Sequence, residues 1–259
     1  MSLVTITING KKYQAAETDY VLNIARREGI DIPALCYHEG LAPFGACRLC
    51  MVEVVSGGRP GITTSCTLRA AEGLEVITES EEVLQIRKGL LELYLAQAPD
   101  APYIHELAAR HGVTSTRFVS PPEEAAEKKK CVLCGLCVRI CNEAIGAGVI
   151  NFIGRGPETI VNTPYLEPST QCIGCTACAD VCPTDVIEIS DTDGVRMVAT
   201  WSKTSVPLKK CRLCGSYCAP SALIDTVYRG VPDLPDELKD VCTKCRRRLK
   251  IRTFSQMHR

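Results

Sequence analysis

Two runs of four cysteines stand in the middle of this 259-residue chain, and their spacing is the feature most able to support chemistry. The first run reads C-x2-C-x2-C-x3-C from Cys131 to Cys141, and the second repeats it from Cys172 to Cys182, followed by Pro183. Short spacers let successive thiolates converge on one cube of iron and sulfide, and this spacing is typical of chains with two 4Fe–4S clusters. Disulfides and zinc are the alternatives, but zinc favours paired C-x2-C knuckles.

The same pattern predicts which cysteines share a cluster. In bacterial ferredoxins, three cysteines of each run hold one cluster and the fourth ligates the other. We therefore expect one 4Fe–4S cluster on Cys131, Cys134, Cys137 and Cys182. The second would be held by Cys172, Cys175, Cys178 and Cys141. Gly135 and Gly174 lie within the ligand loops, where a larger side chain would crowd the cluster.

A second group of cysteines lies near the N-terminus, with the spacing C-x10-C-x2-C-x15-C. Its members are Cys36, Cys47, Cys50 and Cys66. Plant-type 2Fe–2S proteins also place three cysteines together and a fourth at a distance, with a shorter first gap. Gly45 and Ala46 are small, as a loop wrapped around sulfides requires. Four buried free thiols are the alternative, but a C-x2-C with flanking cysteines is rarely plain packing.

The C-terminal cysteines form two knuckles, Cys211-x2-Cys214 and Cys242-x2-Cys245. Paired knuckles favour one structural zinc ion held by four thiolates. The alternatives are a third 4Fe–4S cluster that uses Cys218 and cysteines without a metal. A basic run follows, comprising Arg246, Arg247, Arg248, Lys250 and Arg252, and the chain ends at His258 and Arg259. This run is either a docking surface for an acidic partner subunit or a solvated basic end.

The elements around the first cysteine group are short and local. Alternating residues predict a strand over 3–8, a hairpin turn at Asn9-Gly10 and a return strand over 11–16. Thr18 or Asp19 can cap a helix that runs through about Glu28, with Gly29 as its stop. Further strands are expected over 51–55, just before Cys66, and over 74–78. Helices are expected over 81–97, capped by Ser80, and over 103–111, and a polar linker over 120–130.

Composition excludes several classes. Thirty basic and thirty acidic residues balance, so we expect no nucleic-acid partner. The longest apolar stretch, 146–154, is far shorter than a membrane span. The N-terminus lacks a signal-peptide apolar region, and the seventeen cysteines are odd in number, so a reducing, cytoplasmic compartment is expected. Aromatic residues make up only 5%, so we expect the clusters to replace part of the core and folding to depend on metal.

Residues 1–200 resemble the large iron–sulfur subunit of respiratory complex I and its relatives in NAD-linked soluble hydrogenases and formate dehydrogenases. The ten-residue gap between Cys36 and Cys47 and the stretch 131–156 carry the resemblance. That family also has a His-x3-Cys-x2-Cys-x5-Cys motif, whereas no cysteine lies between Cys66 and Cys131 here. We expect that histidine-ligated cluster to be absent, with His105 and His111 on a surface helix.

The resemblance implies an α+β fold in four parts. These are a β-grasp 2Fe–2S ferredoxin domain over 1–80, a helical linker over 81–125, a two-cluster bacterial ferredoxin-like domain over 126–200 and a small cysteine-rich metal-binding module over 201–259. The expected cofactors are one 2Fe–2S cluster, two 4Fe–4S clusters and one zinc ion, the last with the 4Fe–4S alternative.

The clusters would supply one-electron chemistry. No G-x-G-x-x-G fingerprint for a dinucleotide is present, and the chain ends before the catalytic domains that its larger relatives append. The sequence therefore predicts a non-catalytic electron-relay subunit of a hetero-oligomer. Its partners would be a flavin subunit that binds NADH and a hydrogenase or formate dehydrogenase subunit, in a complex that could also bifurcate electrons to ferredoxin.

Two other classes of protein are alternatives for this chain. One is the iron–sulfur subunit of a succinate dehydrogenase or fumarate reductase. Its first cysteine gap is usually four residues rather than ten, and it lacks the C-terminal knuckles. The other is a redox-sensing module, which usually needs a single exposed, labile centre.

Overall fold

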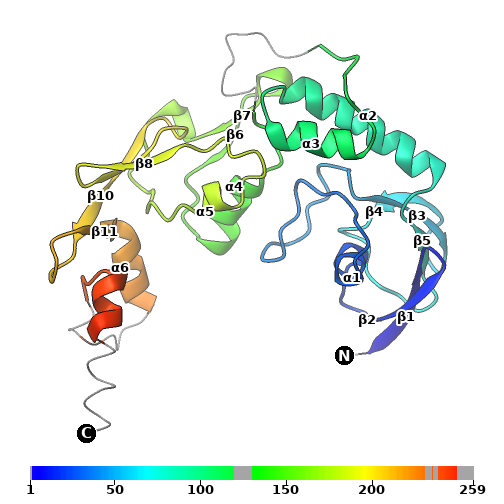
Figure 1. Cartoon of the computed structure of the whole chain (residues 1–259), viewed down its shortest axis with the longest axis horizontal. Coiled ribbons are helices and arrows are strands. Elements are labelled where there is room, and N and C mark those ends of the chain that lie inside the picture. The colour runs from blue at the N-terminus through cyan, green and yellow to red at the C-terminus, as the bar shows by residue number, and fades with distance from the viewer. Residues whose placement is uncertain (1, 120–129, 231–234, 236–238, 250–259) are drawn as a thin grey trace, which may run out of the picture. The chain divides into compact units, whose positions relative to one another are not determined.

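The computed structural model describes residues 2–119, 130–230, 235 and 239–249 (Figure 1). The chain folds into two compact units. Unit 1 comprises Met1–Leu136 and Pro183–Asp185, and unit 2 comprises Cys137–Cys182 and the chain from Val186 onward. Most of the predicted polar linker, 120–129, lies outside the described residues.

A five-stranded sheet forms the frame of unit 1. Its strands are β1 (Leu3–Ile8), β2 (Lys11–Ala16), β3 (Met51–Ser56), β4 (Gly61–Thr64) and β5 (Glu75–Ile77). They lie in the order β2-β1-β5-β3-β4, and β1 pairs with β5 in parallel while the other neighbours are antiparallel. The predicted hairpin is confirmed: Asn9 and Gly10 both have positive φ, as a two-residue turn requires.

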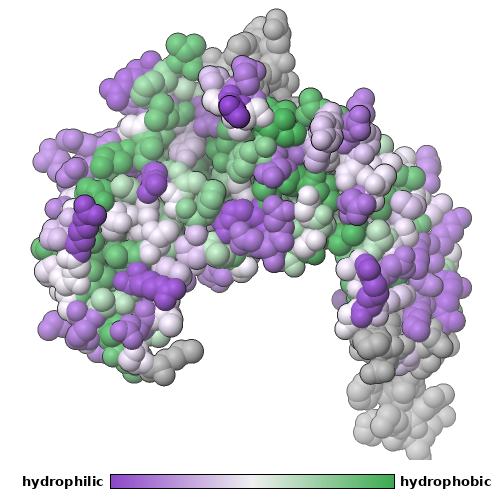
Figure 2. All heavy atoms as spheres, turned by 180° about the vertical axis from the view of Figure 1, so that it is seen from behind, coloured by the Kyte–Doolittle hydropathy of each residue, from purple (hydrophilic) through white to green (hydrophobic). Residues whose placement is uncertain are grey.

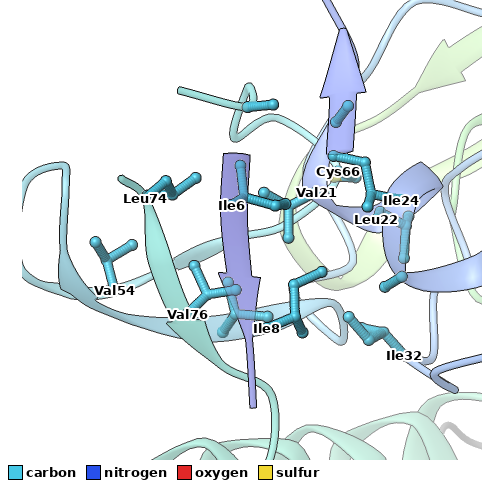
Figure 3. Close-up of a cluster of buried hydrophobic side chains, with 14 of the residues drawn as sticks. Ile6, Ile8, Val21, Leu22, Ile24, Ile32, Val54, Cys66, Leu74 and Val76 are labelled. Atoms are coloured by element: carbon cyan, nitrogen blue, oxygen red, sulfur yellow. The ribbon is translucent and has the colours of Figure 1, made fainter. Parts of the chain in front are cut away.

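Helix α1 (Val21–Arg27) packs its buried face on this sheet. Figure 3 shows Val21, Leu22 and Ile24 of α1 facing the apolar side chains of β1 and β5, and all these residues belong to one buried cluster. The predicted start of the helix was wrong. Tyr20 occupies the N-cap position, and Asp19 instead accepts a hydrogen bond from the Ala16 amide at 3.2 Å.

Two further helices complete unit 1: α2 (Glu81–Gln97) and α3 (Pro102–Arg110). They pack side by side, and their apolar residues share a second buried cluster with Cys36 and Cys47. The predicted bounds of α2 are confirmed. Ser80 is its N-cap residue, but its side chain makes no capping bond, and Oγ is buried without a hydrogen-bond partner among the described residues.

Unit 2 contains short elements around cysteines of both central runs. They are the helical turns α4 (Leu136–Arg139, starting at the last residue of unit 1), η2 (Ile140–Ala144), η3 (Gly156–Glu158), η4 (Pro164–Leu166) and α5 (Ala177–Asp180), with the strand pair β6 (Asn151–Ile153) and β7 (Ile160–Asn162). Five cysteines are packed against its core of Val149, Ile150, Ile187, Val198 and Trp201. Cysteine side chains thus occupy part of the space that a usual core fills.

A four-stranded antiparallel sheet continues unit 2 toward the C-terminal cysteines. Its strands are β8 (Ile189–Thr192), β9 (Val195–Val198), β10 (Thr204–Lys210) and β11 (Tyr217–Pro220), followed by α6 (Ser221–Gly230). The β9–β10 pairing joins residues on either side of the domain boundary predicted at residue 200.

The surface mixes polar and apolar side chains. Figure 2 shows hydrophilic and hydrophobic residues interspersed over the face it displays. Within the described part of the chain, no helix has both the length and the apolar character needed to cross a membrane.

Candidate iron–sulfur and metal centres

The N-terminal cysteines converge at one end of the β-grasp sheet. Cys36 and Cys47 lie in the long loop between α1 and β3, Cys50 directly precedes β3, and Cys66 follows β4. All four side chains are buried, with at most 3% of their surface exposed. Gly45 has a φ of +68°, which favours glycine, and a Cβ there would lie 3.3 Å from Thr67.

Their thiols form two interacting pairs. A hydrogen bond from Cys36 lowers the pKa of Cys47 to about 6, and the pKa of Cys36 is raised by the same contact. Cys66 likewise lowers the pKa of Cys50 to about 7, and its own pKa is raised. Backbone amides point at the first pair: Leu35 donates to the Cys47 sulfur at 3.4 Å, and Cys47 to the Cys36 sulfur at 3.3 Å. Two buried cysteine pairs, the first of them with backbone amide donors, fit a 2Fe–2S cluster, in which each iron takes two thiolates.

Helix α2 supplies two side chains that hold this cysteine loop. The hydroxyl of Tyr94 donates to the carbonyl of Cys47 at 3.1 Å. Arg87, only 1% exposed, donates to the carbonyls of Leu49 and Met51, which flank Cys50. Sequence reasoning missed Arg87. The sequence did hold a signal of its burial: Arg87 lies four residues from both Val83 and Leu91, on the apolar face of the helix.

The second cysteine run lines a cavity that lies wholly within unit 2. Its volume is about 450 Å³, including space open to solvent, and its wall includes Cys172, Cys175, Cys178 and Cys141. The fourth cysteine of the first run therefore faces the same cavity as three cysteines of the second. The rest of the wall is mainly aliphatic, together with the Trp201 ring. Four sulfurs that line one apolar hollow fit a 4Fe–4S cluster.

Two further residues hold this second-run site. Trp201, 3% exposed, donates its indole Nε1–H to the Cys178 sulfur at 3.5 Å. Arg196 donates to the carbonyl of Gly174 at 2.8 Å and forms an ion pair with Asp191 at 2.7 Å. Gly174 has a φ of +68°, and a Cβ there would lie 2.8 Å from Cγ of Pro220. The ligand loop is therefore closely packed against β11.

The remaining set predicted for a 4Fe–4S cluster is divided between the two units. Cys131 and Cys134 belong to unit 1, whereas Cys137 and Cys182 belong to unit 2. Within unit 1, Cys134 packs against the buried cluster that contains Cys36 and Cys47. The joint ligation of one cluster by these four residues stays a prediction.

The C-terminal knuckles come together closely. The sulfurs of Cys211, Cys214, Cys242 and Cys245 all lie within 4.8 Å of one another. Those of Cys214 and Cys242 are 3.8 Å apart. In the described part of the chain, this is the one group of at least three Cys, His, Asp or Glu that could hold a single metal ion. Cys242 also donates its backbone amide to the Cys211 sulfur at 3.3 Å, which lowers the pKa of Cys211 to about 6.

Other residues named from the sequence lie outside these groups. Cys218 is directed to the Ser216 carbonyl at 3.4 Å, and burial raises its pKa to about 11. His105 is exposed on α3, with Nε2 2.6 Å from the Pro99 carbonyl oxygen. His111 follows α3 and is half-buried. Of the basic run, Arg246, Arg247 and Arg248 are described, whereas Lys250, Arg252, His258 and Arg259 lie outside the described residues.

Comparison with protein-family models identifies two modules. Residues 2–81 match a 2Fe-2S iron-sulfur cluster binding domain, and residues 130–186 match a 4Fe-4S dicluster domain. These matches coincide with the N-terminal cysteine group and the two central runs.

Curated relatives share most of this chain. It is 31% identical over 236 residues to the NADPH-Fe(3+) oxidoreductase subunit alpha of Geobacter sulfurreducens, covering 83% of this chain and 27% of the relative. It is also 31% identical over 214 residues to the NADP-reducing hydrogenase subunit HndD of Solidesulfovibrio fructosivorans, covering 72% and 36%. The mitochondrial NADH-ubiquinone oxidoreductase 78 kDa subunit of Candida albicans is 29% identical over 201 residues, covering 70% and 28%. The chain thus spans about a quarter to a third of the length of these relatives.

A solved structure shows the same relationship at the level of the fold. The crystal structure of NAD+-reducing [NiFe]-hydrogenase in the H2-reduced state contains a chain that aligns with a TM-score of 0.54 and 30% identity. The match covers 62% of this chain and 75% of that one. The matched 2Fe–2S module precedes the matched 4Fe–4S module, as the cysteine motifs do along the sequence. The chain belongs to the family of iron–sulfur subunits shared by the NADH-quinone oxidoreductases and the NAD(P)-linked hydrogenases.

Proposed function

We propose that this chain is an electron-relay subunit that connects a flavin subunit handling NAD(H) to a separate catalytic subunit. The observation that carries the proposal is the gathering of sulfur ligands at separate sites of one chain. Four buried cysteines pair at the β-grasp loop, and four more line the cavity of unit 2. Such centres, when loaded, supply one-electron transfer, and the protein controls their position and potential.

The two cysteine sites of this chain differ in environment, which suits a relay. The N-terminal thiols are buried beneath α2 and receive backbone amide hydrogen bonds. The unit 2 cysteines line an apolar cavity and receive the indole hydrogen bond of Trp201. Hydrogen bonds to the sulfurs, net charge and solvent exposure set the potentials of such centres. An electron-transfer chain requires several centres of different potential, whereas a redox sensor requires a single site.

For partners, we propose a flavin-containing NADH-oxidising subunit and a hydrogenase or formate dehydrogenase subunit, in a hetero-oligomer that could also reduce ferredoxin. The support is that the relatives bear the names of subunits of NAD(P)-linked oxidoreductases and a hydrogenase. A reducing, cytoplasmic setting is part of the proposal, because thiolates that hold metal centres must be kept from forming disulfides.

For the C-terminal knuckles, we propose a structural zinc ion. Around a tetrahedral zinc with Zn–S bonds of about 2.3 Å, neighbouring sulfurs lie about 3.8 Å apart. Cys214 and Cys242 have this separation, and the whole group fits within 4.8 Å. A cubane would place a block of iron and sulfide between the four thiolates and hold them farther apart. The short distances therefore favour a single ion over a third 4Fe–4S cluster.

The test is metal analysis and redox spectroscopy of the anaerobically reconstituted chain. One 2Fe–2S and two 4Fe–4S clusters require two, four and four irons, about ten in all, with about one zinc. We expect EPR signals from three reducible centres and no reduction of a dye by NADH unless the flavin subunit is added. An iron content near six, or dye reduction by the chain alone, would contradict the proposal.

A further inference from the structure

A buried arginine lies against the backbone of the N-terminal cysteine loop. Arg87 projects from α2, and 1% of its surface is exposed. Its Nε donates to the Leu49 carbonyl at 3.3 Å, and its Nη2 donates to the carbonyls of Met51 at 3.3 Å and Thr78 at 3.2 Å. Cys50, which is completely buried, lies between the first two acceptors in the sequence.

The charge of this guanidinium has no counter-ion among the described residues. No ion pair of Arg87 occurs there. The acidic residues that act on it electrostatically, Glu79 and Asp31, are exposed. Three carbonyls satisfy part of its hydrogen-bonding capacity, but burying a full positive charge without a partner is costly. A negative group beside it would offset that cost.

The adjacent cysteines are the source of such a charge when they hold their cofactor. Four thiolates and two sulfides outweigh the charge of two ferric ions, so the ligated centre is negative. Taking up one electron, without a proton, makes it more negative by one charge. A fixed cation in the same water-excluded environment therefore stabilises the reduced form more than the oxidised form.

We propose that Arg87 is the buried counter-charge of the 2Fe–2S centre and raises its reduction potential. This deepens the proposed function, because it rests on Cys36, Cys47, Cys50 and Cys66 as the ligands. The planar guanidinium bridges two carbonyls on either side of Cys50 and a third beyond β5, so its charge is held in one place relative to that ligand. Lysine has the charge but not this fork.

The experiment is an EPR-monitored redox titration of the fully loaded chain, with dithionite as reductant. Arg87→Gln and Arg87→Met remove the charge, and Arg87→Lys keeps it. In the neutral variants we expect the reduction equilibrium of the 2Fe–2S centre to fall at least tenfold, a lowering of about 59 mV for one electron. Arg87→Lys should change it less than tenfold. The potentials of both 4Fe–4S centres should stay unchanged.

Two variants serve as matched controls. Lys88→Gln removes a positive charge from the exposed neighbour on the same helix, and we expect no shift. Tyr94→Phe removes the hydrogen bond to the Cys47 carbonyl but no charge, and we expect a shift well below tenfold. A shift in Tyr94→Phe as large as in Arg87→Gln would overturn the assignment to charge and favour a mechanical clamp.

Other outcomes are equally decisive. A loaded neutral variant with an unchanged 2Fe–2S potential overturns the inference and leaves the relay intact. Loss of the 2Fe–2S cluster from both neutral variants also overturns it, because Arg87 would then be needed for assembly of the centre. If the wild-type chain itself shows no 2Fe–2S signal, the ligand assignment in the proposed function has failed instead.

Discussion

Removing one knuckle cysteine should unfold the C-terminal metal module, defined here by the described residues between Cys211 and Leu249. Its buried cluster consists of Cys211, Cys245 and Val241, with Cys218, Cys242 and Leu249 partly buried. Helix α6 contributes no buried residue. Full burial of an aliphatic side chain contributes about 1.5–3 kcal/mol, whereas structural zinc binding contributes about 10–16 kcal/mol. The proposed zinc ion, once bound, is therefore the dominant stabilising term of this module.

The perturbation is Cys242→Ser, measured by hydrogen exchange and metal analysis. The module's amide bonds include Cys211 to the Ser216 carbonyl at 2.8 Å and Arg246 to the Cys242 carbonyl at 2.9 Å. We expect these amides to lose their protection and about one zinc to be lost. Amides of the β1–β5 sheet and the iron content should stay unchanged, because that sheet has its own core.

Cys218→Ser is the matched control, since Cys218 lies outside the group of four sulfurs. It should keep its zinc and the protection of the module. Retained protection in Cys242→Ser after zinc loss would refute the energetic argument. Loss of a reducible EPR signal with unchanged zinc would show that the knuckles hold an electron carrier.

Three other substitutions, one of them with a matched control, test the second-run site. Cys141→Ser should remove or damage the cluster in the unit 2 cavity, lowering the iron content from about ten toward about six; loss of the other 4Fe–4S signal alone would contradict the shared cavity. Trp201→Phe removes the hydrogen bond to Cys178 and should lower the potential of that centre by up to about 59 mV, a tenfold change, read by EPR titration; an upward shift would count against it. Gly174→Ala places a side chain at positive φ, which costs about 1–2 kcal/mol, and adds steric overlap with Pro220. We expect this variant to lose its cluster to a chelator faster than the wild type. Gly146→Ala, also at positive φ but with open space, has only that cost and should lose its cluster more slowly.

Local patterns in the sequence were sufficient for the elements that depend on neighbouring residues. The hairpin at Asn9-Gly10 and the bounds of α2 follow from turn chemistry and apolar periodicity. The start of α1 was wrong because Tyr20 is held by a bridge to Arg69, a contact that no local pattern encodes. Ser80 has the residue type of a cap, yet its hydroxyl makes no capping bond.

The cysteine spacing predicted the chemistry because thiolates a few residues apart can converge on a shared metal centre. The family, the cluster types and the separate knuckles were all readable from it. The tertiary structure added what spacing cannot give. Cys141 and the second run are 31 residues apart at the nearest, and only folding brings them to one cavity.

The tertiary structure alone decided what surrounds the sulfurs. Arg87 is 37 residues from Cys50 in the sequence, and a basic residue on a helix usually predicts a solvent-facing position. It is buried because three carbonyls of the sheet and loop converge on it. The sulfur separations at the knuckles, which favour zinc over a cubane, are likewise distances between residues brought together by folding. The candidate cysteine ligands can thus be predicted from short-range spacing, whereas the electrostatic environment of each ligand depends on long-range packing.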